Sequence, residues 1–281
     1  MIRRLLPKRL RFGEEATVVE HLTELRHRLL IALFAIVPAF VVAFIFHEQL
    51  IEWLIRPLPD DKQLVTLGVT EPFTTAVKVS LIAAIAVVLP ILLWQLWAFL
   101  APAVDEKIQR ALVVFVVFST GLFAAGVAFT YFVVMPKAIT FLTEFDEELY
   151  DVQIRASYYL SFVAVLLLAA GIAFQMPIFI LALVRIGVVT SASLRRNRRY
   201  ALVGLVAFAI LLPTVDPVSL ALELIPLLVL FELSIWLSAL MERRWERSWR
   251  DSLDDWLDAE ENIDGEEIED EREQVGTRDD V

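Results

Sequence analysis

Four long stretches of this sequence contain no Asp, Glu, Lys or Arg, and they limit the chain to folds that suit a membrane. A bilayer core of about 30 Å is crossed by about 20 apolar residues of α-helix. The four stretches approach or exceed that length, in a chain that is 58% hydrophobic. We predict a transmembrane helix in each of Leu29–Phe46, Val79–Leu100, Ala111–Met135 and Tyr158–Val184.

Two further apolar stretches are weaker candidates. Ala201–Leu212 contains only 12 residues, which is about 18 Å of helix at about 1.5 Å per residue. Val218–Leu240 is longer, but Glu223, Pro226 and Glu232 interrupt it. We therefore predict an all-α polytopic membrane protein with six transmembrane helices, of which the fifth and sixth are short.

The distribution of Lys and Arg tests this topology. If the segments between six spans alternate across a membrane, one side carries 20 of these residues and the other carries 5. Because positive residues accumulate on the cytoplasmic side, both termini are predicted to be cytoplasmic. A five-span topology would put the four arginines of 243–250 outside, and we reject it. The predicted organisation is a cytoplasmic segment 1–28, a membrane domain 29–240 and a cytoplasmic tail 241–281.

The net charge of −11 arises in that tail. Residues 251–281 contain 15 acidic and 2 basic residues, so the rest of the chain is close to neutral. The tail is also poor in large apolar residues and is predicted to be disordered. The loops predicted to face outward are acidic as well, which fits either a high-salt cell or ordinary solvated loops.

Composition also excludes several kinds of site. The chain has no Cys, which rules out disulfides, thiolate–zinc sites and catalytic thiols, and its three His form no cluster. The phosphate-binding pattern G-x-x-x-x-G-K-[ST] and the zinc pattern H-E-x-x-H are both missing. We predict no metal, no cofactor and, without a basic surface, no nucleic-acid partner.

The segment before the first span is predicted to form an amphipathic helix. Thr17 followed by Glu20 is typical of a capping box, so the helix should begin there. Glu24 and Arg28 are four residues apart on one face of that helix. They favour either a solvated ion pair worth about 0.3–0.5 kcal/mol or a carboxylate at the membrane surface that receives an arginine from a partner.

Polar side chains within the last spans need an explanation, because an ionisable group at a helix centre costs roughly 2.5–3.5 kcal/mol. Glu223 lies near the turn at Asp216 and is expected to reach water. Glu232 and Gln175 lie deeper in their spans. Each of these two fits either a hydrogen bond between packed helices or a polar cavity with a function.

At this point the sequence resembles a known family. His-Leu-Thr-Glu-Leu-Arg-His-Arg-Leu at 21–29 is similar to the H-L-x-E-L-R-x-R-L signature of TatC, the receptor subunit of the twin-arginine protein translocase. Further matching pieces follow in the same order over residues 17–241. They are Ile55–Leu58, Thr70–Phe73, Trp94–Pro102, Tyr131–Pro136, Gly171–Pro177, Arg198–Tyr200, Leu212–Pro217, Ile225–Pro226 and Phe231–Glu232.

The resemblance implies a receptor in the cytoplasmic membrane rather than an enzyme. It implies binding of twin-arginine signal peptides and recruitment of TatA-type subunits, with a TatB-type subunit in some organisms, to export folded proteins on the proton gradient. It also implies a homo-oligomer in the receptor complex. The alternative is a small secondary transporter or channel, which predicts charged residues at the membrane midplane and internal repeats that this sequence lacks.

The resemblance also assigns residues. Glu24 falls on the family's first signal-peptide-binding glutamate, and Phe99 falls on an aromatic residue of the same site. A carboxylate accepts the planar fork of a guanidinium in a bidentate way that lysine does not match. The family's second loop glutamate falls on Ile108, so Glu106 is proposed as its substitute from charge and position.

A second departure lies in the fourth span, where the family's intramembrane glutamate falls on Gln175. This residue keeps a hydrogen-bonding group but carries no charge. We hypothesise that the short fifth and sixth helices thin the membrane locally. With Gln175, Asp216 and Glu232 they would form a polar pocket where the TatA-type partner assembles.

Overall fold

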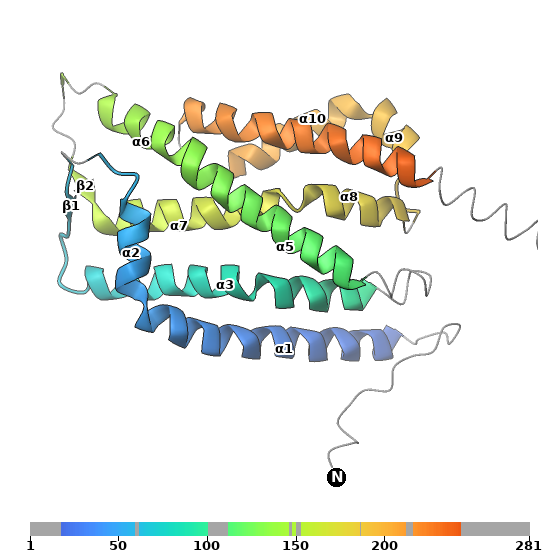
Figure 1. The fold of residues 1–281 in the computed structure, drawn as a ribbon, viewed down its shortest axis with the longest axis horizontal. Coiled ribbons are helices and arrows are strands. Elements are labelled where there is room, and N and C mark those ends of the chain that lie inside the picture. Colours follow the sequence, from blue (N-terminus) through green and yellow to red (C-terminus); the bar gives the residue numbers. More distant parts are fainter. Residues whose placement is uncertain are drawn as a thin grey trace, which may run out of the picture.

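The computed structural model describes residues 18–59, 62–100, 112–145, 148–149, 153–185, 187–211 and 216–242. This part of the chain is almost entirely helical, and five of its helices are long and apolar enough to cross a membrane (Figure 1). The prediction of an all-α polytopic membrane protein is therefore confirmed. The predicted acidic tail and most of the N-terminal segment lie outside the described residues.

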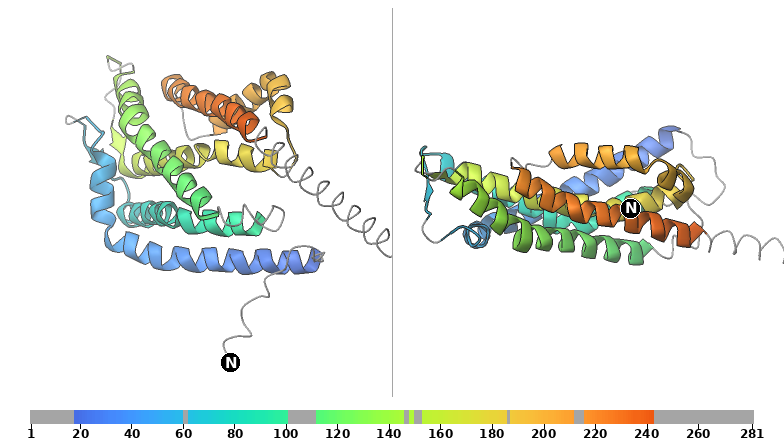
Figure 2. Two further views of the ribbon diagram at one scale, coloured as in Figure 1. Left: turned by 45° about the vertical axis from the view of Figure 1, so that its right-hand side comes forward. Right: turned by 90° about the horizontal axis from the view of Figure 1, so that it is seen from above.

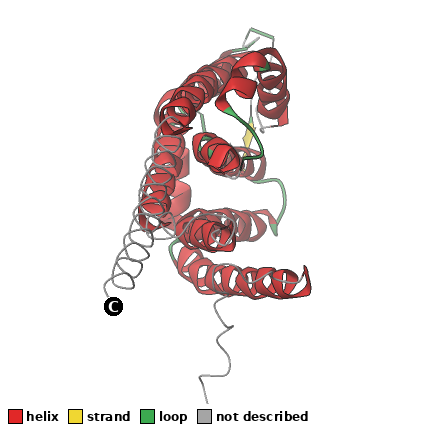
Figure 3. Ribbon diagram, turned by 90° about the vertical axis from the view of Figure 1, so that its right-hand side faces the viewer, coloured by secondary structure: helices red, strands yellow, loops and turns green. Residues whose placement is uncertain are grey.

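The first two spans form an antiparallel pair. Helix α1 (Val18–Ile45) is followed by α2 (His47–Ile55) and, after a loop, by α3 (Glu71–Leu100), which runs back along α1. The predicted amphipathic helix and the first span are thus one unbroken helix. Viewed along the bundle, α1 forms one edge of it (Figure 3), and none of its apolar window is buried in the protein. We expect lipid to cover this surface, since bilayer-facing side chains are apolar.

The middle of the chain forms two bent rods. The first joins α5 (Leu112–Phe129), the π-helical turn η3 (Thr130–Val134) and α6 (Met135–Glu144). The second joins α7 (Ala156–Ala173) to α8 (Met176–Arg185). The break lies at Phe174 and Gln175, and Pro177 follows in the first turn of α8. A proline is tolerated in a first helical turn, but in a continuous helix it would lack the N–H that bonds to Ala173 and its ring would clash with that carbonyl.

Glycines let these two rods approach closely. A Cβ atom at Gly171 would lie 2.4 Å from the Phe123 ring, and one at Gly126 would lie 2.7 Å from Phe174. Neither distance is sterically acceptable, so any larger residue at either position would push the rods apart. This explains why Gly171 stands in one of the segments quoted above.

A short strand pairing joins two loops at the end of the bundle where α3 begins. Strand β1 (Leu64–Val65) pairs in parallel with β2 (Ile154–Arg155), in the register Leu64 to Ile154 and Val65 to Arg155. The first predicted outer loop is thereby tied to the third. The largest buried cluster lies nearby and includes Leu54, Met135 and Val163.

The C-terminal part of the described chain contains α9 (Ser191–Arg196), α10 (Arg198–Leu211) and a last helix, Pro217–Glu242. They lie on the side of the bundle away from α1 (Figures 1 and 2). A short helix lies where the fifth span is predicted: α10 has 14 residues and is not among the five helices long enough to cross a membrane. The sixth differs from the prediction: its helix has 26 residues, since Glu223, Pro226 and Glu232 lie within the helix without ending it.

Candidate functional site

The start of α1 and the end of α3 lie at the same end of the bundle (Figure 1). There the Oε1 atom of Glu24 accepts hydrogen bonds from the Nε and Nη2 atoms of Arg28, the first at 3.0 Å. The Nη1 atom of Arg28 donates to Gln95 Oε1 of α3 at 3.4 Å. The predicted ion pair on α1 is therefore present, and it is connected to the neighbouring span.

This ion pair is partly open. About one fifth of each side chain is exposed, 20% for Glu24 and 21% for Arg28. All hydrogen bonds that Glu24 accepts from described residues fall on Oε1 and come from a single partner. The second oxygen thus keeps its capacity to accept an N–H donor from outside the chain.

Phe99 lies one helical turn beyond Gln95, on the same face of α3, and its side chain is half-buried. Nearby on α3, Trp97 is buried and contacts the rings of Phe115 (5.6 Å between centroids) and Phe179 (6.3 Å). These aromatic contacts fix the end of α3. We call Glu24, Arg28, Gln95 and Phe99 the α1–α3 site. Glu106 lies outside the described residues.

The polar residues predicted inside the membrane do not come together. Gln175, at the break between α7 and α8, is buried, and its Nε2 atom donates to the backbone oxygen of Ser119 at 2.8 Å. The hydrogen bond joins two packed helices, which is one of the two interpretations that the sequence left open. Asp216 caps the last helix, because its Oδ1 atom accepts from the Ser219 N–H at 2.7 Å.

The two glutamates of the last helix reverse the expected order of burial. Glu223, expected to reach water, is only 3% exposed. Glu232, expected to be deeper, has half of its side chain exposed and pairs with Arg198 of α10 at 2.8 Å. Nine residues separate them, about two and a half turns, so they face opposite sides. Hydropathy indicates how deep each glutamate lies along the span, but not which of the two faces packs against the protein.

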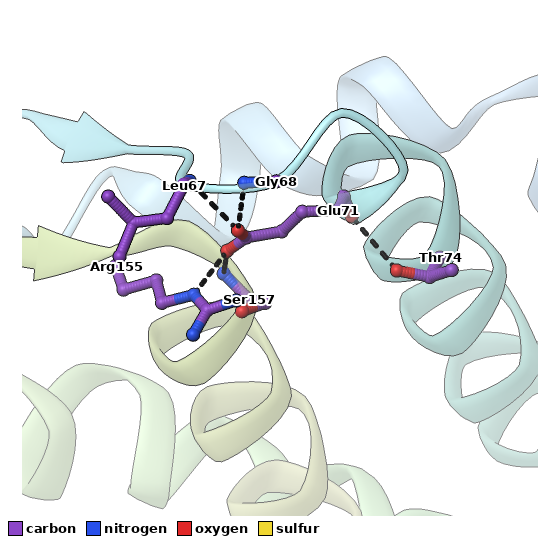
Figure 4. Close-up of polar contacts among 6 residues, drawn as sticks. All are labelled: Leu67, Gly68, Glu71, Thr74, Arg155 and Ser157. Carbon is purple, nitrogen blue, oxygen red and sulfur yellow. Dashed lines mark hydrogen bonds and ion pairs between the residues drawn. The ribbon is translucent and has the colours of Figure 1, made fainter.

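A further polar cluster was not predicted. Glu71, at the start of α3, is 5% exposed and accepts four hydrogen bonds (Figure 4). Its Oε2 atom accepts from the N–H groups of Leu67 (3.0 Å) and Gly68 (3.2 Å), and its Oε1 atom accepts from Arg155 Nε (3.0 Å) and the Ser157 N–H (3.2 Å). We call these five residues the loop clasp.

The loop clasp joins two segments, residues 67–71 and 155–157, beside the β1–β2 pairing. The Glu71 carboxylate raises the pKa of Arg155 above its ordinary value, so the pair stays charged. Thr70–Phe73 is one of the segments that resemble the TatC family, but its sequence does not indicate the contact between Glu71 and Arg155. Because Arg155 lies 84 residues away, no local pattern in the sequence predicts the pairing.

Within the described ranges, no group of three or more His, Asp or Glu side chains is arranged to hold a metal ion. The geometry of the α1–α3 site suits recognition by charge and hydrogen bonding. A partly exposed carboxylate at a helix end suits a cationic, fork-shaped donor such as a guanidinium.

Comparison with known proteins gives one consistent result. Residues 20–226 match the family described as "Sec-independent protein translocase protein (TatC)". The Helicobacter pylori (strain J99) protein of that name is 36% identical over 76% of this chain and 86% of its own length. The protein of that name from Escherichia coli (strain K12) is 35% identical over 79% of this chain and 87% of its own length.

A solved structure agrees. It is described as the crystal structure of the twin-arginine translocase receptor TatC in DDM, and it is 36% identical to this chain. It superimposes with a TM-score of 0.71 and covers 78% of this chain and 99% of its own.

Proposed function

Because this chain belongs to the TatC family of Sec-independent protein translocase proteins, we propose that its α1–α3 site binds twin-arginine signal peptides. The chain is a multi-pass membrane protein and a protein-transport component. The observation that carries the proposal is Glu24: a carboxylate 20% exposed, already paired with an arginine, and open on one oxygen.

Arg28 acts in this proposal as an internal substitute for the peptide. It holds Glu24 through the Nε and Nη2 edge of its guanidinium while Nη1 reaches Gln95. A peptide arginine that presents the same edge to Glu24 displaces Arg28, and Gln95 retains it. Lysine lacks the planar fork and competes poorly with an arginine already in place.

Two further residues complete the proposed site. Phe99, one turn from Gln95 and half-buried, places an aromatic ring beside Glu24 and Arg28 at this end of α3. Glu106 supplies the second carboxylate from the segment after α3. Two carboxylates would explain a preference for two consecutive arginines over one.

We further propose that the α1–α3 site faces the cytoplasm, in the plasma membrane, with both termini inside. The count of 20 against 5 basic residues supports this orientation. So does α9, whose last turn carries Arg195 and Arg196, because it lies at the same end of the bundle as the start of α1. The segments 1–28 and 241–281 are then cytoplasmic.

The proposed contact with TatA-type subunits lies on α10 and the last helix. As a helix, the 14 residues of α10 span about 21 Å, less than a bilayer core, and this mismatch favours local thinning. Of the three polar residues predicted there, Glu232 is the one with an exposed side chain. Gln175 and Asp216 act indirectly, by holding the helix break and the helix start. Assembly into a homo-oligomer, and with a TatB-type subunit, belongs to the same proposal.

Photo-crosslinking of a twin-arginine signal peptide to membranes containing the full-length protein tests the receptor function. Probes stand beside Glu24 and along 103–110. The peptide is offered to wild type, Glu24→Ala, Glu106→Ala and Glu48→Ala, the last being an exposed control at the other end of α1. A twin-lysine peptide is run in parallel.

We expect crosslinks that are lost in Glu24→Ala and Glu106→Ala and with the twin-lysine peptide, and kept in Glu48→Ala. Crosslinks that survive Glu106→Ala alone would remove Glu106 from the site and leave the function in place. A twin-arginine peptide that crosslinks nowhere would contradict the receptor function.

A further inference from the structure

Three polar side chains follow one another on one face of the last helix, at i, i+3 and i+7. Asp216, Ser219 and Glu223 are 5%, 0% and 3% exposed. Within the described part of the chain, four of their oxygens have no hydrogen-bond partner: Asp216 Oδ2, Ser219 Oγ and both carboxyl oxygens of Glu223. Buried polar groups are satisfied as a rule, by protein or by ordered water.

A second element presents a polar group to the same place. Glu223 lines a pocket together with Thr130, the first residue of the π-helical turn η3. Thr130 is fully buried, and its Oγ1 atom also lacks a partner among the described residues. Single π-helical turns are often found at functional sites. Residues of two different helices thus line one pocket that has room for about one water molecule.

The remainder of the pocket is uncharged. Its other lining residues are Phe129, Ala170, Ala173, Phe174 and Leu227, contributed by α5, α7, the break after α7, and the last helix. Asp216 lies about two turns before Glu223 on the same face. A charged Glu223 carboxylate that is away from bulk water, with no cation among the residues that line its pocket, is costly, whereas a neutral carboxylic acid can donate to a water or to Thr130.

We propose that Glu223 is a buried proton-exchange site, which water reaches from the β1–β2 end of the bundle along Asp216 and Ser219. A proton from water or hydronium binds a Glu223 carboxylate oxygen, and the reverse step returns it to the same water. Asp216 lies at the start of the helix and Glu223 two turns further in, so the stripe leads from the bundle end to the pocket. This site is separate from the α1–α3 site and does not depend on the receptor function.

Infrared spectroscopy of the full-length protein in lipid vesicles tests the proposal. The glutamates carry ¹³C at the side-chain carboxyl carbon, which separates a Glu carboxylic acid band from an Asp band. The variants are Glu223→Gln and the matched control Glu232→Gln, the exposed glutamate of the same helix. Transfer to D₂O then reports how fast the carboxyl proton exchanges, and Ser219→Ala and Asp216→Asn report on the route.

At neutral pH we expect a ¹³C-shifted carboxylic acid band that is lost in Glu223→Gln and kept in Glu232→Gln. The frequency of this band shifts within seconds of transfer to D₂O in wild type, and more slowly in Ser219→Ala and Asp216→Asn. In wild type alone, the lack of a Glu acid band, or a band that does not respond to D₂O, overturns the proposal even if a variant fails to fold. Unchanged exchange in both route variants overturns the path along Asp216 and Ser219.

Discussion

The two ends of the bundle use the same pair of residue types in opposite ways. At one end, Glu71 is 5% exposed and its four donors come from four residues in two segments of the chain. At the other, Glu24 is 20% exposed and its donors come from one side chain four residues away. A glutamate–arginine pair therefore holds loops together in the loop clasp and stays replaceable in the α1–α3 site.

The number of independent donors accounts for the difference. An arriving cation must displace an arginine and three backbone N–H groups to reach Glu71, and those N–H groups would then lose their acceptor. At Glu24 it displaces one side chain, which keeps its hydrogen bond to Gln95. The exposure of the carboxylate adds to this, because Glu71 is 5% exposed and Glu24 is 20% exposed, whereas Arg155 at 35% is more exposed than Arg28 at 21%. A less exposed carboxylate is screened less by water.

The largest effect is expected from breaking the loop clasp. Glu71→Ala leaves the Arg155 guanidinium and three backbone N–H groups without their acceptor, and it removes the side-chain contacts that hold the loop before α3 against the start of α7. We expect the unfolding midpoint in detergent to fall by many degrees and the yield of folded protein to drop. Differential scanning fluorimetry measures the midpoint, with the exposed Glu48→Ala as control. Equal midpoints for the two variants would show that the loop clasp is dispensable.

The next effect separates binding from stability. Glu24→Gln removes the charge but keeps the side-chain volume, so we expect an unchanged unfolding midpoint and weaker binding of a twin-arginine peptide. One charge-assisted hydrogen bond is worth about 1.5–3 kcal/mol, which corresponds to about a 10- to 150-fold rise in Kd. Fluorescence anisotropy with a labelled peptide measures it. If the midpoint falls and the Kd does not rise, Glu24 has a structural role like that of Glu71.

A smaller effect of opposite sign is expected at Arg28. Arg28→Gln removes the internal competitor of the peptide, and a partly exposed pair is worth about 0.2–1 kcal/mol. We therefore expect peptide binding to tighten by about 1.5- to 5-fold in the same anisotropy assay. Arg28→Lys, which keeps the charge without the fork, should lie between wild type and Arg28→Gln. Weaker binding in Arg28→Gln would mean that Arg28 contacts the peptide instead of competing with it.

The α1–α3 site was more accessible to sequence reasoning than the loop clasp. Glu24 and Arg28 are four residues apart on one helix, so the helical period alone predicts their contact. Gln95 and Phe99 are neighbours on α3 for the same reason. Glu71 and Arg155 are brought together only by the folding of two distant loops. Apolar length predicts the spans in the same way, because it is also a local property.

Within a span, the sequence likewise does not predict which side chains of the last helix are buried. Hydropathy predicts how deep each residue lies in the membrane. By this measure Glu232 lies nearer the centre of the span than Glu223 does. Burial depends on which face packs against α7 and η3, and that is the face of Glu223. The length of this helix was underestimated for a related reason: a glutamate that is covered by protein, or paired with Arg198, does not end a span.

Gln175 supplies the smallest predicted effect and the sharpest contrast with Glu71. Both side chains are buried, but Gln175 makes one hydrogen bond, to the Ser119 backbone oxygen, where Glu71 makes four. Hydrogen bonds between membrane helices average about 0.6 kcal/mol and reach at most about 1.7 kcal/mol. Gln175→Met, similar in volume, should therefore lower the unfolding midpoint by a small fraction of the Glu71→Ala effect, measured in the same fluorimetric assay. A fall comparable to that of Glu71→Ala would mean that the break between α7 and α8 depends on this one bond. Stability would then follow the position of a buried polar group rather than its number of donors.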